Sequence, residues 1–248
     1  MLGRARLADY LKAVPVRMPR WRRRSPDALQ GEDPVSFAVA TPFRDDAAFR
    51  RAYAAGEATG SWWGFDVEWR ASIVCWAALQ GRSLEGDFVE VGVHRGGYAR
   101  MVVDYVGFET LTGKSFYLID TYCGIPAAHR TGAAALFDGV YGDCYEDVLR
   151  TFTPFDTVRI VRGAVPEVLD TVRPARVAFL SIDLNSAEPS ARALEHFWPL
   201  MVQGAVAVLD DYNFELFADQ RAALDAAAAR LGAPILALPS GQGLMVKR

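Results

Sequence analysis

Three aspartates near the ends of two apolar runs are the residues of this sequence best placed to do chemistry. Asp183 lies in the run 177–184, and Asp210 and Asp211 directly follow the run 205–209. If both runs are strands of one open sheet, the three carboxylates converge beyond the carboxyl ends of the strands, where ligands bind. Neighbouring carboxylates repel one another and raise one another's pKa unless a cation compensates them.

An all-oxygen cluster of this kind suits a hard divalent ion, Mg²⁺ or Mn²⁺. Such an ion lowers the pKa of an acceptor hydroxyl and holds its oxygen in line for group transfer. The plainer alternative is that Asp210 or Asp211 only caps a helix or stabilises a loop.

A glycine-rich segment at the end of another apolar run indicates a cofactor site. Glu90 lies in the run 88–93, and Gly92 and Gly96 follow it with Gly-x-x-x-Gly spacing. Glycine suits such a turn because it lets a ligand approach the backbone and tolerates positive φ. The spacing differs from the GxGxxG of nicotinamide-binding domains. An acid followed by Gly-x-x-x-Gly is instead typical of the loop that cradles the methionine part of S-adenosylmethionine, although a tight turn without a ligand is the plainer alternative.

Two further residues are predicted to complete this cofactor site. Asp120 ends the run 116–120, where a carboxylate can accept hydrogen bonds from both hydroxyls of a ribose. Gly163 follows the run 158–161 and is expected beside the adenine. Because NAD and S-adenosylmethionine both carry a ribose, Asp120 indicates a nucleoside cofactor without choosing between the two.

The elements that must position these residues alternate in type along the chain. Five apolar runs lack polar alternation, as strands covered on both faces do. They are 88–93, 116–120, 158–161, 177–184 and 205–209. Helical stretches separate them, which predicts a doubly wound parallel sheet. Before them, an apolar periodicity over 62–84 that includes Trp76 and Leu79 predicts a helix ending at Gly81.

The C-terminal part breaks this alternation. Residues 219–231 read as an alanine-rich helix, and 235–238 and 244–247 as two strands with a short glycine-containing link. So short a link cannot hold a crossover helix, so the last strand must run antiparallel to its neighbour. We therefore predict an α/β fold with a Rossmann-like seven-stranded sheet that ends in an antiparallel C-terminal hairpin, as in class I S-adenosylmethionine methyltransferases.

Composition narrows the remaining classes. The chain has 248 residues, 51% of them hydrophobic, which suits one α/β domain with extensions. A net charge of −3 gives no electrostatic case for a nucleic acid partner. No run approaches the roughly 20 apolar residues that span a bilayer. The three cysteines form no CxxC pair, so we expect free thiols, buried at Cys75 and Cys123, in a reducing cytoplasm.

The N-terminal segment has a different composition from the rest. Residues 1–25 carry eight basic residues and one acid, and apolar residues recur at helical spacing over 2–14. This pattern predicts a short amphipathic helix within the segment. The helix either binds a membrane surface or a partner, or it packs on the domain or on a second subunit. We predict a partly helical N-terminal extension over 1–60, a main domain over 61–248 and a homo-oligomer.

Five longer sequence segments resemble those of one enzyme family. They are 68–70, 84–92, 119–126, 210–212 and 238–243. Together they are similar to the macrocin-type sugar O-methyltransferases, which act on deoxysugars of macrolide and aminocoumarin antibiotics. The resemblance implies a metal-assisted enzyme that uses S-adenosylmethionine to methylate a hydroxyl of a small, glycosylated natural product. It also implies that Asp183, Asp210 and Asp211 bind the metal.

One position departs from the family pattern. Members tend to carry a second acid two residues after the first aspartate, as a candidate general base, but here Asn185 stands there. An amide cannot take up a proton at neutral pH. Either the metal alone acidifies the hydroxyl, or another group such as His129 serves as the base, or this member does different chemistry or none. His129 also has a plainer interpretation as an exposed loop residue.

The stretch of about 124–147 is predicted to be a lid over the acceptor. It combines aromatic residues with scattered glycines and acids, which suits a mobile cover. Trp62 and Trp63 either line the opposite wall, where their rings stack on a sugar, or seal the core.

Two other functions compete with the transferase. A non-catalytic relative that keeps the fold for a structural or regulatory role is motivated by Asn185. A nicotinamide-dependent reductase is opposed by the glycine spacing, by the terminal hairpin and by the lack of a Tyr-x-x-x-Lys pair.

Overall fold

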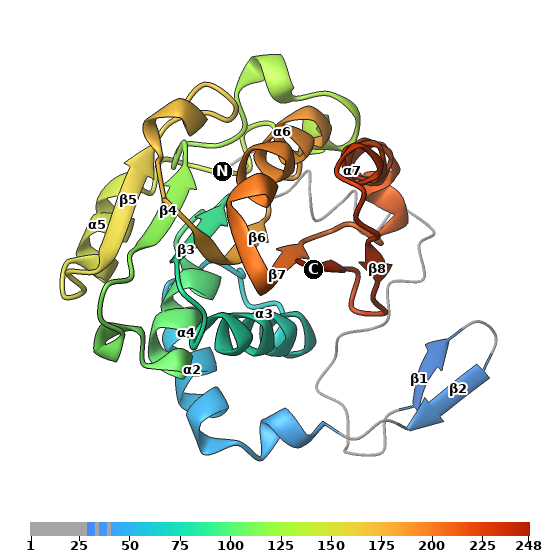
Figure 1. Ribbon diagram of the computed structural model, residues 1–248. Helices are drawn as coiled ribbons and strands as arrows, with labels where there is room; N and C mark the ends of the chain where they lie inside the picture. Colours follow the sequence, from blue (N-terminus) through green and yellow to red (C-terminus); the bar gives the residue numbers. More distant parts are fainter. Residues whose placement is uncertain (1–28, 33–34, 39–40) are drawn as a thin grey trace.

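The predicted seven-stranded sheet forms the centre of the protein (Figure 1). The computed structural model describes residues 29–32, 35–38 and 41–248. Five parallel strands follow the predicted runs closely: β3 (Asp87–Val91), β4 (Phe116–Asp120), β5 (Val158–Arg162), β6 (Val177–Ile182) and β7 (Met201–Leu209). The order β5-β4-β3-β6-β7-β9-β8 reverses direction between β3 and β6, and such a switch point is where open α/β sheets bind ligands.

The C-terminal hairpin is also confirmed. β9 (Gly243–Val246) lies between β7 and β8 (Leu236–Ala237) and runs antiparallel to both. The preceding helix α7 (Ala218–Arg230) matches the alanine-rich stretch.

Helices cover both faces of the sheet, as a doubly wound fold requires (Figure 1). One face carries α2 (Ala47–Glu57), α3 (Glu68–Gly81), α4 (Gly97–Val106) and α5 (Tyr145–Phe152). The other carries α6 (Ala187–Phe197) and α7. Successive strand residues point to opposite faces. In β3, accordingly, Phe88 belongs to the first hydrophobic cluster and Val89 to the second.

Short 3₁₀ helices make the connections. They are η1 (Pro42–Arg44), η2 (Phe108–Thr110), η3 (Ala127–His129), η4 (Gly132–Phe137), η5 (Leu169–Thr171), η6 (Trp198–Leu200) and η7 (Glu215–Phe217). Two of them, η3 and η4, lie within the predicted lid.

Helix α3 departs from the sequence prediction in its start and in its buried face. It begins at Glu68 rather than near residue 62, because Trp63 and Gly64 have positive φ, which no helix residue adopts. Its predicted apolar stripe is partly exposed, at 48% for Trp76 and 39% for Leu79. The sheet instead contacts its small residues: a Cβ at Gly81 would lie 2.5 Å from the Ala178 carbonyl oxygen.

The N-terminal part is described only in pieces. Strands β1 (Leu29–Glu32) and β2 (Val35–Ala38) pair antiparallel. The amphipathic helix predicted over 2–14 lies outside the described residues. Helix α2 packs into the same cluster as α4, through Phe49 and Ala52. The division at residue 60 stays a prediction.

Within the described part of the chain, no helix is both long and apolar enough to cross a membrane.

The cysteine prediction is half right. Cys75 is a buried free thiol on α3, but Cys123 is exposed, because the loop after β4 turns it toward solvent. Cys144 is the second buried thiol, and its sulfur lies 3.3 Å from the His94 carbonyl oxygen.

Gly92 holds the ends of β3 and β6 together. Its φ is +88°, and a Cβ there would lie 1.9 Å from the Asp183 carbonyl oxygen. The Asp183 amide also donates to the Val91 carbonyl oxygen at 2.7 Å. Glycine is therefore required at position 92 for two reasons: the positive φ of the turn and the close approach of the Asp183 backbone.

We expect Gly92→Ala to destabilise the fold strongly. A left-handed φ costs alanine about 1–2 kcal/mol, and forced overpacking adds about 1–3 kcal/mol. Gly113→Ala is the matched control, since Gly113 has φ +73° and nothing within 4 Å of an added Cβ. Urea unfolding should show a larger loss for Gly92→Ala by the overpacking amount. Equal losses would mean that the contact with Asp183 yields at no cost.

Candidate functional site

A cavity of about 370 Å³ opens at the carboxyl ends of the parallel strands. The residue directly after each of these strands lines it: Gly92, Thr121, Gly163, Asp183 and Asp210. The loop before α3, the predicted lid and the segments 184–189 and 214–217 supply most of the remaining walls. The sheet therefore brings residues from five separate strand ends to one place.

All but one of the residues predicted for the site line this cavity. They are Glu90, Gly92, Asp120, His129, Gly163, Asp183, Asp210 and Asp211. Gly96 does not line it. It precedes α4 with φ +84°, and a Cβ there would lie 2.5 Å from the Phe152 ring. Gly96 therefore shapes the turn and admits the Phe152 ring of α5.

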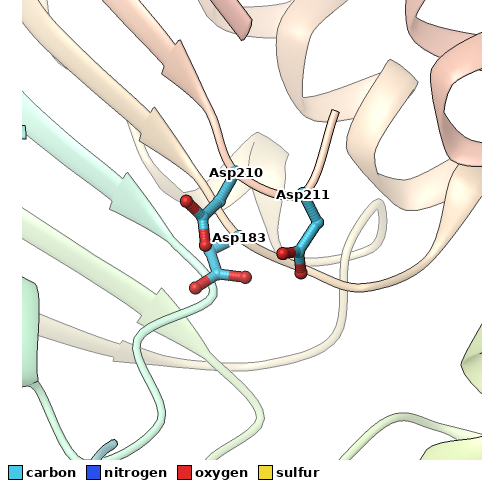
Figure 2. Close-up of side chains that lie close together, drawn as sticks. All are labelled: Asp183, Asp210 and Asp211. Atoms are coloured by element: carbon cyan, nitrogen blue, oxygen red, sulfur yellow. The ribbon is translucent and has the colours of Figure 1, made fainter. Parts of the chain in front are cut away.

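The three aspartates converge as the sequence predicts (Figure 2). One carboxylate oxygen from each of Asp183, Asp210 and Asp211 lies within 4.8 Å of the other two. Asp183 follows β6 and the other two follow β7, with the carboxylates turned toward one another. Oxygen atoms at this spacing are donors suited to a hard divalent cation.

Arg70 is the site residue that sequence reasoning missed. Its Nη2 contacts Asp210 Oδ2 and lies 2.8 Å from Asp211 Oδ1, and its Nε lies 3.2 Å from Asp210 Oδ1. The side chain comes from α3, some 140 residues before the aspartates. The segment 68–70 contributes to the family resemblance, but the resemblance gives it no role in the site. No spacing rule connects a helix residue to a strand end so far along the chain.

The charges in this cluster are unevenly compensated. Burial and the neighbouring Asp211 carboxylate raise the pKa of Asp183 to about 7, although the Arg70 guanidinium opposes the shift. Burial lowers the pKa of the Arg70 guanidinium, but nearby Tyr98 and Asp211 side chains raise it above its usual value. The arginine is therefore a permanent cation at two of the three carboxylates.

Asp210 has further partners that do not depend on Arg70. Gln242 donates from Nε2 to Asp210 Oδ1 at 3.0 Å, and Gln220 donates to the Asp210 carbonyl oxygen at 3.0 Å. Both amides are buried. They hold the end of β7 in place from the hairpin and from α7.

The cofactor half contains one unpartnered carboxylate and one fully used one. Glu90 is buried, its Oε2 has no hydrogen-bond partner, and burial raises its pKa well above the usual value. Asp120 accepts hydrogen bonds at 2.7 and 2.8 Å from the backbone amides of Val93 and His94, and at 2.7 Å from Tyr122. Asp120 thus orders the glycine loop in addition to any contact with a ribose.

Backbone strain concentrates at this cavity. Five non-glycine residues in the described chain have a positive φ, and all five line the cavity: Trp63, His94, Tyr122, Asn185 and Asp211. Such conformations cost energy and persist where the surroundings enforce them, often at functional sites. Their shared location supports the cavity as the working part of the molecule.

The two tryptophans before α3 have different surroundings. Trp62 is buried and stacks on Tyr53 at 4.9 Å, so it seals the core at the cavity floor. Trp63 packs on His94 and on Tyr141 of the lid, with ring centroids 5.3 and 5.4 Å away. Burial lowers the pKa of His94 to about 4, so its ring is neutral at physiological pH.

The predicted lid is fastened to the rest of the site at several points. Phe137 stacks on Phe217 with centroids 6.0 Å apart, in a small apolar cluster separate from the two main ones. Ser186 donates to the His129 carbonyl oxygen at 2.8 Å. The His129 ring nitrogens lie 3.6 Å from a Glu188 carboxylate oxygen and 3.9 Å from one of Glu167.

Asn185 contacts the first aspartate directly. Its Nδ2 donates to Asp183 Oδ1 at 3.2 Å. Among the described residues, no hydrogen bond joins His129 to any of the three aspartates. Asn185 therefore orients Asp183, while His129 is joined through its backbone to Ser186, the residue after Asn185.

Comparisons with known proteins identify relatives of this chain. A family model described as Macrocin-O-methyltransferase (TylF) matches residues 73–229. A demethyldecarbamoylnovobiocin O-methyltransferase from Streptomyces niveus is 26% identical over 149 residues, which cover 56% of this chain and 57% of that protein. An 8-demethyl-8-(2,3-dimethoxy-alpha-L-rhamnosyl)-tetracenomycin-C 4'-O-methyltransferase from Streptomyces olivaceus is 25% identical over 156 residues, which cover 58% of this chain and 60% of that protein.

A solved structure, that of the O-methyltransferase NovP, superposes with a TM-score of 0.63. It is 22% identical and covers 72% of this chain and 79% of its own, which shows a shared fold. The chain thus spans about three fifths of the length of the curated relatives it matches.

We expect Asp183→Asn to change how stability depends on pH in metal-free buffer. A folded pKa of about 7, above the usual value, means that the protonated aspartate stabilises the fold fully at low pH. This contribution is lost as the pH rises through about 7. Between about pH 5 and pH 8, wild type should therefore lose about 2–3 kcal/mol relative to Asp183→Asn, since each pH unit between the unfolded and the folded pKa costs about 1.4 kcal/mol.

Urea unfolding in EDTA at each pH measures this difference. Asp104→Asn, which removes a carboxylate from the outlying ion pair with Arg100, is the control. A difference between wild type and Asp183→Asn that stays constant with pH would contradict the raised pKa.

Proposed function

This chain belongs to the macrocin-O-methyltransferase family, and we propose that it transfers a methyl group from S-adenosylmethionine to a hydroxyl of a small molecule. The observation that carries the proposal is that one cavity holds two groups of acidic residues, one at the glycine loop and one at the ends of β6 and β7. Glu90 and Asp120 surround the glycine loop, and the three aspartates lie at the neighbouring strand ends. A donor and an acceptor bound at these two places would meet inside the cavity.

The chain's own residues suit S-adenosylmethionine. Glu90 offers an unpartnered carboxylate oxygen inside the cavity, a suitable acceptor for the cofactor's ammonium group. Asp120 lines the same cavity, where a ribose hydroxyl would replace its longest contact, that of Thr121 Oγ1 at 3.2 Å. Gly163 lines the cavity beside it, and its lack of a side chain makes room for Val168. When bound, the cofactor supplies an electrophilic methyl group, which the acceptor oxygen takes from sulfur.

The three aspartates fit a divalent cation, Mg²⁺ or Mn²⁺. Their donor set is all oxygen, and the oxygens lie close enough together to share one ion. When bound, such an ion lowers the pKa of an acceptor hydroxyl. Asn185 meanwhile orients the Asp183 carboxylate through its amide, and the lid excludes water from the reacting groups.

The acceptor we propose is a sugar hydroxyl of a glycosylated natural product. The names of the two Streptomyces relatives, which refer to novobiocin and to a rhamnosyl tetracenomycin, support this class. The acceptor side of the cavity is bounded by Phe137 and Phe217 of the apolar lid cluster and by Asp211. An apolar wall beside polar carboxylates suits a sugar attached to a hydrophobic aglycone.

The proton acceptor is proposed to be Asp183 or His129. Asp183 lies at the carboxylate cluster, where the acceptor hydroxyl would bind. His129 lies in the predicted lid and lines the same cavity, and its carbonyl oxygen accepts a hydrogen bond from Ser186, three residues after Asp183.

A non-catalytic role is the second candidate function, because Asn185 replaces the acid that family members tend to carry. Release of S-adenosylhomocysteine on addition of glycosylated hydroxyl acceptors separates the two. Turnover with any such acceptor excludes the non-catalytic role, and cofactor binding without turnover across the acceptor panel favours it.

We expect Glu90→Gln to weaken S-adenosylmethionine binding by roughly 10- to 100-fold. A hydrogen bond to a charged group contributes about 1.5–3 kcal/mol, and each 1.4 kcal/mol is about tenfold in Kd. Calorimetry measures the Kd, and Glu109→Gln in η2, outside the cavity lining, is the matched control. Unchanged affinity in Glu90→Gln would remove Glu90 from the cofactor site.

We expect Asp210→Asn to weaken Mg²⁺ or Mn²⁺ binding at least about tenfold, since loss of even an indirect partner of a metal costs that much. The cofactor affinity should stay near that of wild type in EDTA, because Asp210 lies on the acceptor side. Calorimetric titration of the metal and of the cofactor, with Asp104→Asn as the control, measures both. A metal heat that persists in Asp210→Asn places the ion elsewhere, and no heat in wild type contradicts metal assistance.

A further inference from the structure

We propose that Arg70 is a built-in competitor for the cation position of the three aspartates, and that a divalent ion binds there only as its guanidinium withdraws. This inference rests on the proposed metal site. It concerns what the chain itself places in the cluster.

The hydrogen bonds of Arg70 use the oxygens that a metal would need. Two guanidinium nitrogens face both oxygens of Asp210, and Nη2 also contacts Asp211 Oδ1. The planar fork of arginine matches a carboxylate in this two-point way, which makes the contact strong and directional. A divalent cation at the same oxygens would sit beside a fixed positive charge, so the two cations disfavour each other.

Asp183 is the carboxylate that Arg70 leaves free. Among the described residues, its side chain accepts a hydrogen bond only from Asn185, at 3.2 Å. An incoming ion therefore finds one open carboxylate and two that are engaged. Binding to all three requires the guanidinium to give up at least part of its contacts.

The surrounding structure holds Asp210 in place without the guanidinium. Gln242 holds Asp210 Oδ1, and Gln220 holds the Asp210 carbonyl oxygen. Arg70 itself has a second resting contact, because its guanidinium carbon lies 5.4 Å from the centroid of the Phe214 ring. The aromatic face offers a cation–π partner for a guanidinium that has left the carboxylates.

Arg70→Met tests the competition because it removes the charge and keeps an unbranched side chain. We expect Arg70→Met to bind Mn²⁺ at least about tenfold more tightly than wild type, and Arg70→Lys, which keeps the charge but not the fork, to lie between them. Electron paramagnetic resonance of free Mn²⁺ measures the affinity on the full chain without any acceptor. Equal or weaker binding in Arg70→Met overturns the proposal.

Arg100→Met is the matched control. Arg100 also pairs with a carboxylate, that of Asp104, and also lies over an aromatic ring, that of Phe155, but outside the cavity lining. Its loss should leave the Mn²⁺ affinity unchanged. A gain equal to that of Arg70→Met would assign the effect to net charge and overturn the proposal.

Titration with S-adenosylmethionine in the same samples separates failure of this proposal from failure of the proposed function. Mn²⁺ binding by Arg70→Met alone supports the competition and contradicts metal assistance in wild type. Equal Mn²⁺ binding with intact cofactor binding overturns the competition and leaves the methyltransferase standing. If no variant binds Mn²⁺, the competition is overturned. If wild type does not bind S-adenosylmethionine, the methyltransferase proposal is overturned.

A measurement on wild type covers the case in which Arg70→Met fails to fold. The ¹⁵N resonance of the Arg70 Nε group, identified by its absence in Arg70→Lys, should shift on addition of diamagnetic Mg²⁺. An unchanged resonance at saturating Mg²⁺ shows that the guanidinium does not respond to the ion, which overturns the proposal.

Discussion

Three carboxylates that share a partly enclosed site need positive charge nearby, and the architecture around the cavity follows from this constraint. The sheet places Asp183 beside Asp210 and Asp211 because β6 and β7 are parallel neighbours that end at the same edge. Helix α3, in the helical layer on one face of the sheet, then supplies the Arg70 guanidinium. Charge compensation thus links a helix before the first parallel strand of the sheet to the strand ends that carry the acids.

The same end of the sheet holds the cofactor half at a short distance. Gly92 allows the turn after β3 to lie directly against Asp183, so the glycine loop and the acidic cluster share one backbone contact. Asp120 orders this loop through the amides of Val93 and His94. A rigid junction of this kind fixes the relative position of two groups that must meet within a few tenths of an ångström.

Periodic and local features of the fold could be predicted from the sequence, and contacts between distant segments could not. Buried parallel strands are continuous apolar runs, so the strands β3 to β7 could be predicted from the sequence. The short glycine-containing link predicted the hairpin. The three aspartates followed from strand ends. The place of Arg70 in the site could not be predicted, because only tertiary packing decides where a helix side chain points. The predicted burial of Trp76 was wrong, because α3 contacts the sheet through small residues such as Gly81.

The small apolar cluster around Phe137 and Phe217 is built separately from the two large ones that flank the sheet. Its members come from residues 125–141 and from the segment 214–217 after β7, and none of them belongs to a parallel strand. Substitutions in this cluster are therefore expected to alter the wall of the cavity with less effect on the sheet than substitutions in the two large clusters. A lineage with this layout can diversify the molecules it accepts faster than it can alter the chemistry it performs, since the two properties reside in separately packed parts of one chain.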